Sequence, residues 1–141
     1  MIKILLGFLL VMASTFSYAQ KQNWKEEQLM DPAQLAMAVT NNKDLPMIVC
    51  VGPGANIPGS VNIGMVNDKA GIAKLKKAFQ QVPKDRKIVL YCGCCPFEHC
   101  PNAAPAMNIL QAMNFTNYYL LNLPSNLKKD WIDKGYPTTN N

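Results

Sequence analysis

Charged residues are scarce in this sequence, and arginine is nearly absent. Asp, Glu, Lys and Arg together make up 16% of the 141 residues, and Arg86 is the only arginine. The net charge of +5 comes from lysines spread along the chain rather than from a basic run interleaved with aromatic residues. Because nucleic-acid binding depends on concentrated positive charge, the sequence predicts no nucleic-acid partner.

Long hydrophobic runs are also missing, apart from one short stretch near the start. The apolar segment Ile4–Ala13 follows Lys3 and precedes Ser17–Ala19, which has small residues at its first and third positions. This order is typical of a secretory signal peptide, and the apolar core is too short for a permanent transmembrane helix. We therefore expect residues 1–19 to be a signal peptide cleaved after Ala19. The mature protein is then exported, periplasmic or extracellular, with no stable membrane insertion after cleavage.

Internal repeats and low-complexity stretches are absent. The remaining residues 20–141 are enough for one compact domain and too few for two, so a single domain is predicted. Within it, short apolar runs alternate with segments of helical spacing. Continuous apolar runs of this length are typical of strands buried on both faces. Strands are predicted at Met47–Val51, Ile88–Tyr91 and Asn117–Leu121, with a turn into a short strand over 57–63, and helices over 32–41, 72–79, 103–113 and 127–134. The alternation predicts an α/β fold with a parallel sheet flanked by helices on both faces.

Cysteine is the residue type that stands out against this background. Four of the five cysteines, Cys92, Cys94, Cys95 and Cys100, lie between the predicted strand Ile88–Tyr91 and the next helix. Bridges among such close cysteines would restrict the unfolded chain little, and an odd count leaves one thiol unpaired. Backbone N–H groups collect where a buried strand leads into a helix, and they stabilise a thiolate. The sequence therefore indicates sulfur chemistry in this loop.

Three sequence motifs resemble the rhodanese family of single-domain sulfurtransferases. Residues 56–63, Asn-Ile-Pro-Gly-Ser-Val-Asn-Ile, are similar to the family's His-Ile-Pro-Gly-Ala-x-Asn-Ile turn. The segment Ile88–Cys92 resembles the strand that ends in the family's active cysteine, and Trp131 with Gly135–Pro137 resembles its C-terminal Trp and Gly-Tyr-Pro. The resemblance spans residues 29–137 and implies a rhodanese-like domain.

The resemblance implies that Cys92 is the catalytic nucleophile. Its thiolate would take sulfane sulfur from a small-molecule or protein donor, become a persulfide and pass the sulfur to a thiol acceptor, without a cofactor or metal. Loop amides and a helix N-terminus could stabilise both the thiolate and the persulfide anion. The expected active-loop and substrate-binding residues are Gly93, Cys94, Cys95, Pro96, Phe97, Glu98, His99 and Cys100.

The sequence also departs from the family pattern in two places. Cys50 and Gly52 stand where the family usually has an Asp and an Arg, and the loop after Cys92 is several residues longer than usual. The loop has no arginine to bind a dianion, leaving His99, Lys128 or Lys129 as nearby cations. Thiosulfate is therefore not the expected natural donor. Cys50, at the end of a predicted buried strand, is expected to be buried and inert.

Three alternatives stay open at this point. The Cys92–Cys95 pair has the C-x-x-C spacing of a thiol–disulfide redox protein, with Cys100 as a third partner. Cys92, Cys95, His99 and Cys100 could instead bind Zn or Cu(I), although the adjacent His99 and Cys100 strain a tetrahedral site. The third alternative is a rhodanese-like binding module without catalytic activity.

Overall fold

The computed structural model describes residues 23–139, so the predicted signal peptide, residues 1–19, lies outside the described residues. Within residues 23–139, five strands form one parallel sheet in the order β1-β5-β4-β2-β3. No helix in this part of the chain has the length and hydrophobicity needed to cross a membrane. The strands are β1 (Leu29–Met30), β2 (Met47–Cys50), β3 (Val61–Asn62), β4 (Ile88–Tyr91) and β5 (Tyr118–Leu121).

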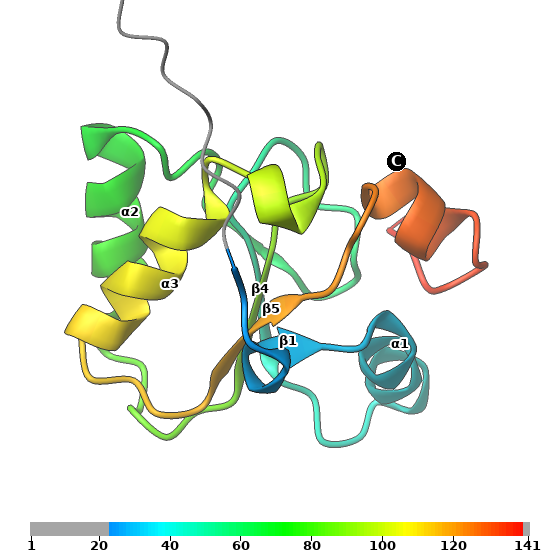
Figure 1. The fold of residues 1–141 in the computed structure, drawn as a ribbon. Coiled ribbons are helices and arrows are strands. Elements are labelled where there is room, and N and C mark those ends of the chain that lie inside the picture. The colour runs from blue at the N-terminus through cyan, green and yellow to red at the C-terminus, as the bar shows by residue number, and fades with distance from the viewer. Residues whose placement is uncertain (1–22, 140–141) are drawn as a thin grey trace, which may run out of the picture.

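Helices cover both faces of the sheet, as the sequence predicted. Figure 1 shows α2 and α3 together on one side, and α1 with the C-terminal helical turn on the other. The fold class is therefore confirmed as α/β with a parallel sheet between two helical layers. The helices are α1 (Pro32–Asn41), α2 (Lys69–Phe79) and α3 (Ala103–Ala112), with the 3-10 turns η1 (Glu26–Gln28) and η2 (Phe97–His99) and the π-helical turn η3 (Lys128–Ile132).

The central strand β4 separates two hydrophobic cores. All four of its residues are buried, and successive side chains point to opposite faces of the sheet. Leu90 belongs to the core that contains Phe79 of α2, while Tyr91 belongs to the core that contains Trp131 of η3. Burial on both faces explains why β4 is a continuous apolar run instead of an alternating one.

Local signals in the sequence position the first helix. The Asp31 side chain accepts hydrogen bonds from the N–H groups of Ala33 and Gln34, at 2.7 and 3.3 Å, and Pro32 occupies the first helical position. These contacts satisfy two N–H groups that have no partner inside the helix. The helix ends at Asn41, where Asn42 adopts a left-handed conformation with φ of 50°.

The structure differs from the predicted elements at its periphery. Strand β1 was not predicted, and it pairs with β5 at the edge of the sheet. Helix α2 begins at Lys69, three residues before the predicted start at Ile72, because Asp68 accepts a hydrogen bond from the Gly71 N–H at 2.7 Å. The last helix is shorter than predicted and forms the π-helical turn η3.

Candidate functional site

The cysteine loop, residues 92–102, leaves the carboxyl end of β4 and leads into α3. Strand β4 lies between β5 and β2, so the loop starts above the middle of the sheet. Backbone hydrogen bonds fix the loop to the segment after β5: the Leu127 N–H donates to the Gly93 carbonyl, and the Phe97 N–H donates to the Leu123 carbonyl, both at 3.1 Å. The carboxyl edge of a parallel sheet is where α/β folds place their ligand sites.

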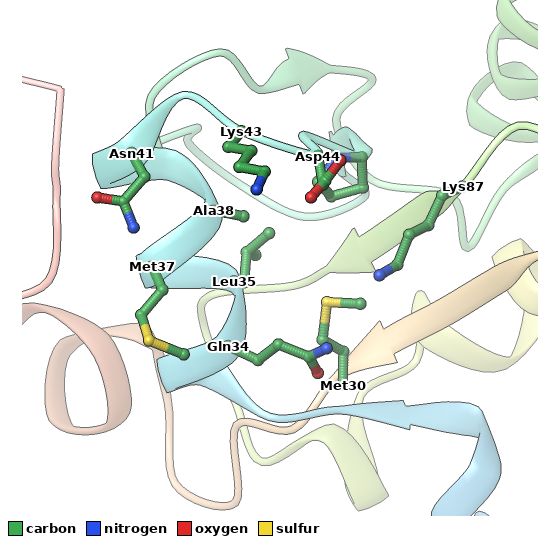
Figure 2. Close-up of a pocket in the computed structure, with 10 residues that line it drawn as sticks. Met30, Gln34, Leu35, Met37, Ala38, Asn41, Lys43, Asp44 and Lys87 are labelled. Carbon is green, nitrogen blue, oxygen red and sulfur yellow. The ribbon is translucent and has the colours of Figure 1, made fainter.

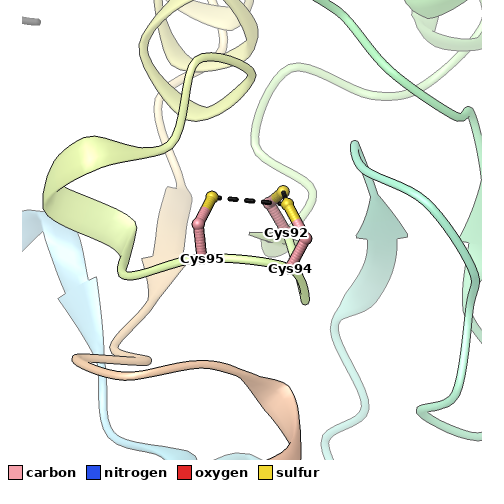
Figure 3. A group of neighbouring side chains, drawn as sticks. All are labelled: Cys92, Cys94 and Cys95. Carbon is pink, nitrogen blue, oxygen red and sulfur yellow. Dashed lines mark hydrogen bonds between the residues drawn. The ribbon is translucent and has the colours of Figure 1, made fainter.

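Three of the four loop cysteines bring their sulfur atoms together. The Sγ atoms of Cys92 and Cys94 are 3.4 Å apart, and those of Cys94 and Cys95 are 3.3 Å apart (Figure 3). Cys92 is buried, Cys95 is half-buried and Cys94 is exposed. The loop therefore presents one exposed thiol directly beside a buried one.

Cys100 lies next to Cys92 at the N-terminal end of α3. A hydrogen bond with Cys100, together with burial, raises the pKa of the Cys92 thiol. The same hydrogen bond lowers the pKa of Cys100, against the effect of burial, with further help from the N–H groups of Asn102 and Ala103. Of the two hydrogen-bonded thiols, Cys100 therefore has the lowered pKa, mainly through Cys92 and in smaller part through the amides at the start of α3.

Asn102 also contacts the Cys92 sulfur, and no motif in the sequence pointed to it. Its side chain is 2% exposed, and its Nδ2 donates to the Cys92 Sγ at 3.7 Å. Its Oδ1 accepts from the Val66 N–H at 2.9 Å, which holds the amide in place. The backbone N–H of Cys94 is a further donor to Cys92. Two N–H donors thus meet the sulfur that the sequence predicted to be reactive.

Gly52 explains how the segment after β2 accommodates that sulfur. A Cβ atom on Gly52 would fall on the Cys92 Sγ, so only glycine allows this approach. Cys50, two residues earlier, is fully buried, as predicted, and its thiol donates to the carbonyl groups of Gly52 and Gly54. Burial also raises the pKa of Cys50, which keeps this thiol protonated.

The other predicted loop residues are spread around the cysteines. Phe97 packs against the core on the α2 and α3 side, whereas the His99 side chain is exposed. Pro96 precedes the 3-10 turn η2 as its N-cap, and Glu98 lies within that turn with its side chain half-buried. Gly93 lies so close to Leu127 that a Cβ atom would be 3.1 Å from the Leu127 Cβ.

The cations considered from the sequence are engaged elsewhere or exposed. Arg86 precedes β4, at the opposite end of the sheet from the loop, and donates to the Leu45 carbonyl at 3.1 Å. Lys128 forms a salt bridge with Asp133 at 2.7 Å, and Lys129 is exposed.

A separate hollow of about 240 Å³ lies between α1 and the start of β4 (Figure 2). Its lining includes Met30, Leu35, Lys43, Asp44 and Lys87 and contains no cysteine. Because Lys87 precedes β4 and Cys92 follows it, this hollow is at the end of the sheet away from the cysteine loop.

Comparison with solved structures identifies the fold class. The single domain sulfurtransferase RDL2 of Saccharomyces cerevisiae superimposes with a TM-score of 0.56 and 20% identity, covering 81% of this chain and 95% of that one. The Alr3790 protein of Anabaena sp. gives a TM-score of 0.56 and 18% identity, with 78% and 90% covered. The 3-mercaptopyruvate sulfotransferase SseA of Escherichia coli, described as having the "Rhodanese" fold, gives 0.50 and 18%, covering 71% of this chain and 41% of that one.

These similarities confirm a rhodanese-like fold, which the three sequence motifs had implied. At 18 to 20% identity they concern the fold and not the chemistry. No protein-family model and no curated protein matches the sequence. The chemistry of the cysteine loop after β4 must therefore be inferred from its own geometry.

Proposed function

We propose that this protein is a sulfurtransferase that carries sulfane sulfur as a persulfide on Cys92. The observation that supports the proposal most directly is the position of Cys92 at the end of the central strand, in contact with the Asn102 Nδ2 and beside Cys100. N–H donors aimed at the sulfur stabilise the negative charge of a thiolate or persulfide. The rhodanese-like fold, which this chain shares with the single domain sulfurtransferase RDL2, is consistent with this chemistry.

The first step uses Cys100 as the base for Cys92. Cys100 is hydrogen-bonded to Cys92, and it takes the proton of the Cys92 thiol as the Cys92 sulfur attacks. The Cys92 sulfur then attacks the outer sulfur of a donor persulfide. The bond between the two donor sulfurs breaks, the donor leaves as a thiolate with the electron pair, and the outer sulfur becomes bonded to Cys92.

The second step transfers the sulfur to an acceptor. The acceptor thiolate attacks the outer sulfur of the Cys92 persulfide, and Cys92 leaves as a thiolate that takes back the proton from Cys100. No electron is gained or lost over the whole cycle, so the reaction requires no redox cofactor. A small-molecule or protein persulfide is the donor class and a thiol is the acceptor class.

The charges of the loop disfavour thiosulfate as the donor. A dianion bound in a buried site needs charge-assisted partners, usually a bidentate arginine. Arg86 is at the far end of the sheet and Lys128 is paired with Asp133.

We further propose that the protein acts outside the cytoplasm, on the basis of the signal peptide predicted over residues 1–19.

Mass spectrometry of the reduced protein after treatment with a persulfide donor tests the assignment. We expect one added sulfur on the wild-type protein and on Cys50→Ser, because Cys50 is buried with its thiol bonded to backbone carbonyls. Cys92→Ser should not gain sulfur. An added sulfur that persists in Cys92→Ser would show that another residue is the nucleophile.

Turnover requires a separate assay, in which transfer to cyanide is followed with a persulfide donor and with thiosulfate. We expect turnover with the persulfide and little with thiosulfate. Absence of turnover with both donors in the fully reduced protein would contradict the enzymatic proposal and favour a binding module.

The distance of 3.4 Å between the Cys92 and Cys94 sulfur atoms favours a second candidate function, reductive sulfur release. In this reaction the Cys94 thiol attacks the Cys92 sulfur of the persulfide, hydrogen sulfide leaves, and a Cys92–Cys94 disulfide forms. An external dithiol must then reduce the disulfide. Release of sulfide in stoichiometric amount without an acceptor, lost in Cys94→Ser, would support this candidate.

A further inference from the structure

The three sulfur atoms of Cys92, Cys94 and Cys95 all lie within 4.8 Å of one another (Figure 3). They come from four consecutive residues. The Cys94 sulfur is 3.4 Å from the Cys92 sulfur and 3.3 Å from the Cys95 sulfur. Sulfur transfer through Cys92, with Cys100 as its base, uses neither Cys94 nor Cys95.

Cys100 lies beside this group of three sulfurs but outside it. Its side chain is hydrogen-bonded to Cys92 and also to Cys95. The chain of contacts therefore runs from Cys92 through Cys94 and Cys95 to Cys100 and back to Cys92. We call these four residues the thiol ring.

We propose that the thiol ring binds one thiophilic metal ion, Zn²⁺ or Cu⁺, through Cys92, Cys94 and Cys95. Sulfur ligands select these soft ions over hard cations such as Mg²⁺ and Ca²⁺. With Zn–S bonds of about 2.3 Å, tetrahedral geometry places sulfur atoms about 3.8 Å apart. The observed separations of 3.3 and 3.4 Å differ from that spacing by only a few tenths of an ångström.

The surroundings of the thiol ring suit a bound ion. Hydrogen bonds from Leu127 to Gly93 and from Phe97 to Leu123 hold the backbone on both sides of Cys94 and Cys95. The Asn102 Nδ2 donates to the Cys92 sulfur, which is how outer residues orient metal ligands. Cys94 is exposed, so an ion has access from solvent. Binding converts the thiols to thiolates and releases their protons to water.

The ligand set differs from the one that the sequence spacing suggested. The metal-binding alternative from the sequence included His99, but its side chain is exposed and lies outside the group that the described residues form. Cys94, which was not in that set, lies between Cys92 and Cys95. His99 extends from η2, whereas the three clustered cysteines lie before this turn.

Competition titrations of the reduced protein test the proposal, with Zn²⁺ and Cu⁺ each titrated anaerobically against a chromophoric chelator. We expect one equivalent of at least one of the ions to bind, which native mass spectrometry would show as one ion per chain. Cys94→Ser should weaken that binding by more than about 100-fold, the upper range for loss of an outer contact. Cys50→Ser and His99→Ala are the controls and should bind as the wild type does.

The proposal is overturned if neither ion binds, or if Cys94→Ser binds as tightly as the wild type. It is also overturned if His99→Ala loses as much affinity as Cys94→Ser. Circular dichroism of each variant checks its fold. Because Cys94 is exposed, Cys94→Ser should fold as the wild type does, and a loss of metal affinity in this variant is then a loss of a ligand. Persulfide formation is measured separately, so failure of one proposal is distinguishable from failure of the other.

Discussion

Asn102 is the residue that connects the cysteine loop to the segment before α2. Its Oδ1 accepts from the Val66 N–H and its Nδ2 donates to the Cys92 sulfur. Asn102→Ala would leave the buried Val66 N–H without its partner, at a cost of about 1–3 kcal/mol in unfolding free energy. Chemical denaturation measures this loss.

Asn102→Asp separates the two roles of this side chain. The carboxylate still accepts from Val66, but it offers no donor to Cys92 and places negative charge beside the sulfur. We therefore expect the pH profile of persulfide formation to shift to higher pH, because a nearby negative charge raises a thiol pKa. An unchanged pH profile in Asn102→Asp would mean that Asn102 is only structural.

Cys95 provides a test based on pH. Burial, with the hydrogen bond between Cys95 and Cys94, raises its pKa to about 12, and the thiolate is the form that reacts with alkylating reagents. Since this pKa lies above the ordinary value, the thiolate fraction rises about tenfold for each pH unit and does not level off below the pKa. Peptide mapping after alkylation at a series of pH values should show Cys95 labelling still rising at about pH 10. A plateau near neutral pH would contradict the raised pKa.

Some residues of the site could be predicted from the sequence alone, and others could not. The sequence located Cys92 because an apolar strand leads directly to it, and it placed Cys50 in the core because that residue lies in a continuous apolar run. Asn102 gave no signal, because an Asn before a helix is usually an N-cap and its contact with Cys92 is tertiary. The lowered pKa of Cys100 likewise depends on tertiary contacts, first its hydrogen bond with Cys92 and then the amides at the start of α3.

At the scale of elements, the segment after β2 lies so close to the start of the cysteine loop that position 52 must be glycine. A Cβ atom at position 52 would overlap the Cys92 Sγ. In Gly52→Ala we expect the Cys92 side chain to be displaced, which should slow persulfide formation and cost about 1–3 kcal/mol of stability through overpacking. Quantitative mass spectrometry over time measures the rate.

Gly54→Ala is the matched control for this change. Gly54 has a φ of 73°, and no atom lies within 4 Å of the place that an added Cβ would take, so alanine there is strained without touching Cys92. We expect a loss of about 1–2 kcal/mol with the rate of persulfide formation retained. Equal effects of the two substitutions on that rate would contradict the role of Gly52.

Element boundaries followed the strength of the local signals. The four buried residues of β4 and the Asp31-Pro32 start of α1 were predicted, because apolar runs and caps are encoded locally. Strand β1 was missed because two residues are too few for a hydrophobic period, and it exists by pairing with β5. The π-helical turn η3 was predicted as a longer helix, since spacing alone does not distinguish the two.

For the whole molecule, stability depends on the two cores that β4 holds apart. Leu90 is completely buried in the core on the α2 and α3 side. Leu90→Ala should lower the free energy of unfolding by about 2–5 kcal/mol, because it removes apolar contacts and leaves a cavity. Urea denaturation followed by circular dichroism measures the change.

Met37→Ala is the control, since this side chain is 60% exposed and belongs to neither core. We expect a change within about 0.5 kcal/mol. A similar loss in both variants would mean that the surface of α1 contributes as much as the central sheet.

The depth at which Cys92 lies selects the shape of molecules that can react with it. Its side chain is 4% exposed, and the exposed Cys94 thiol lies 3.4 Å from it. Under the proposed function, a donor would have to offer its terminal sulfur at the tip of a slender, unbranched arm, and a sulfur flanked by bulky groups would be held outside. Steric access would then limit the choice of sulfur compound in addition to the lack of positive charge.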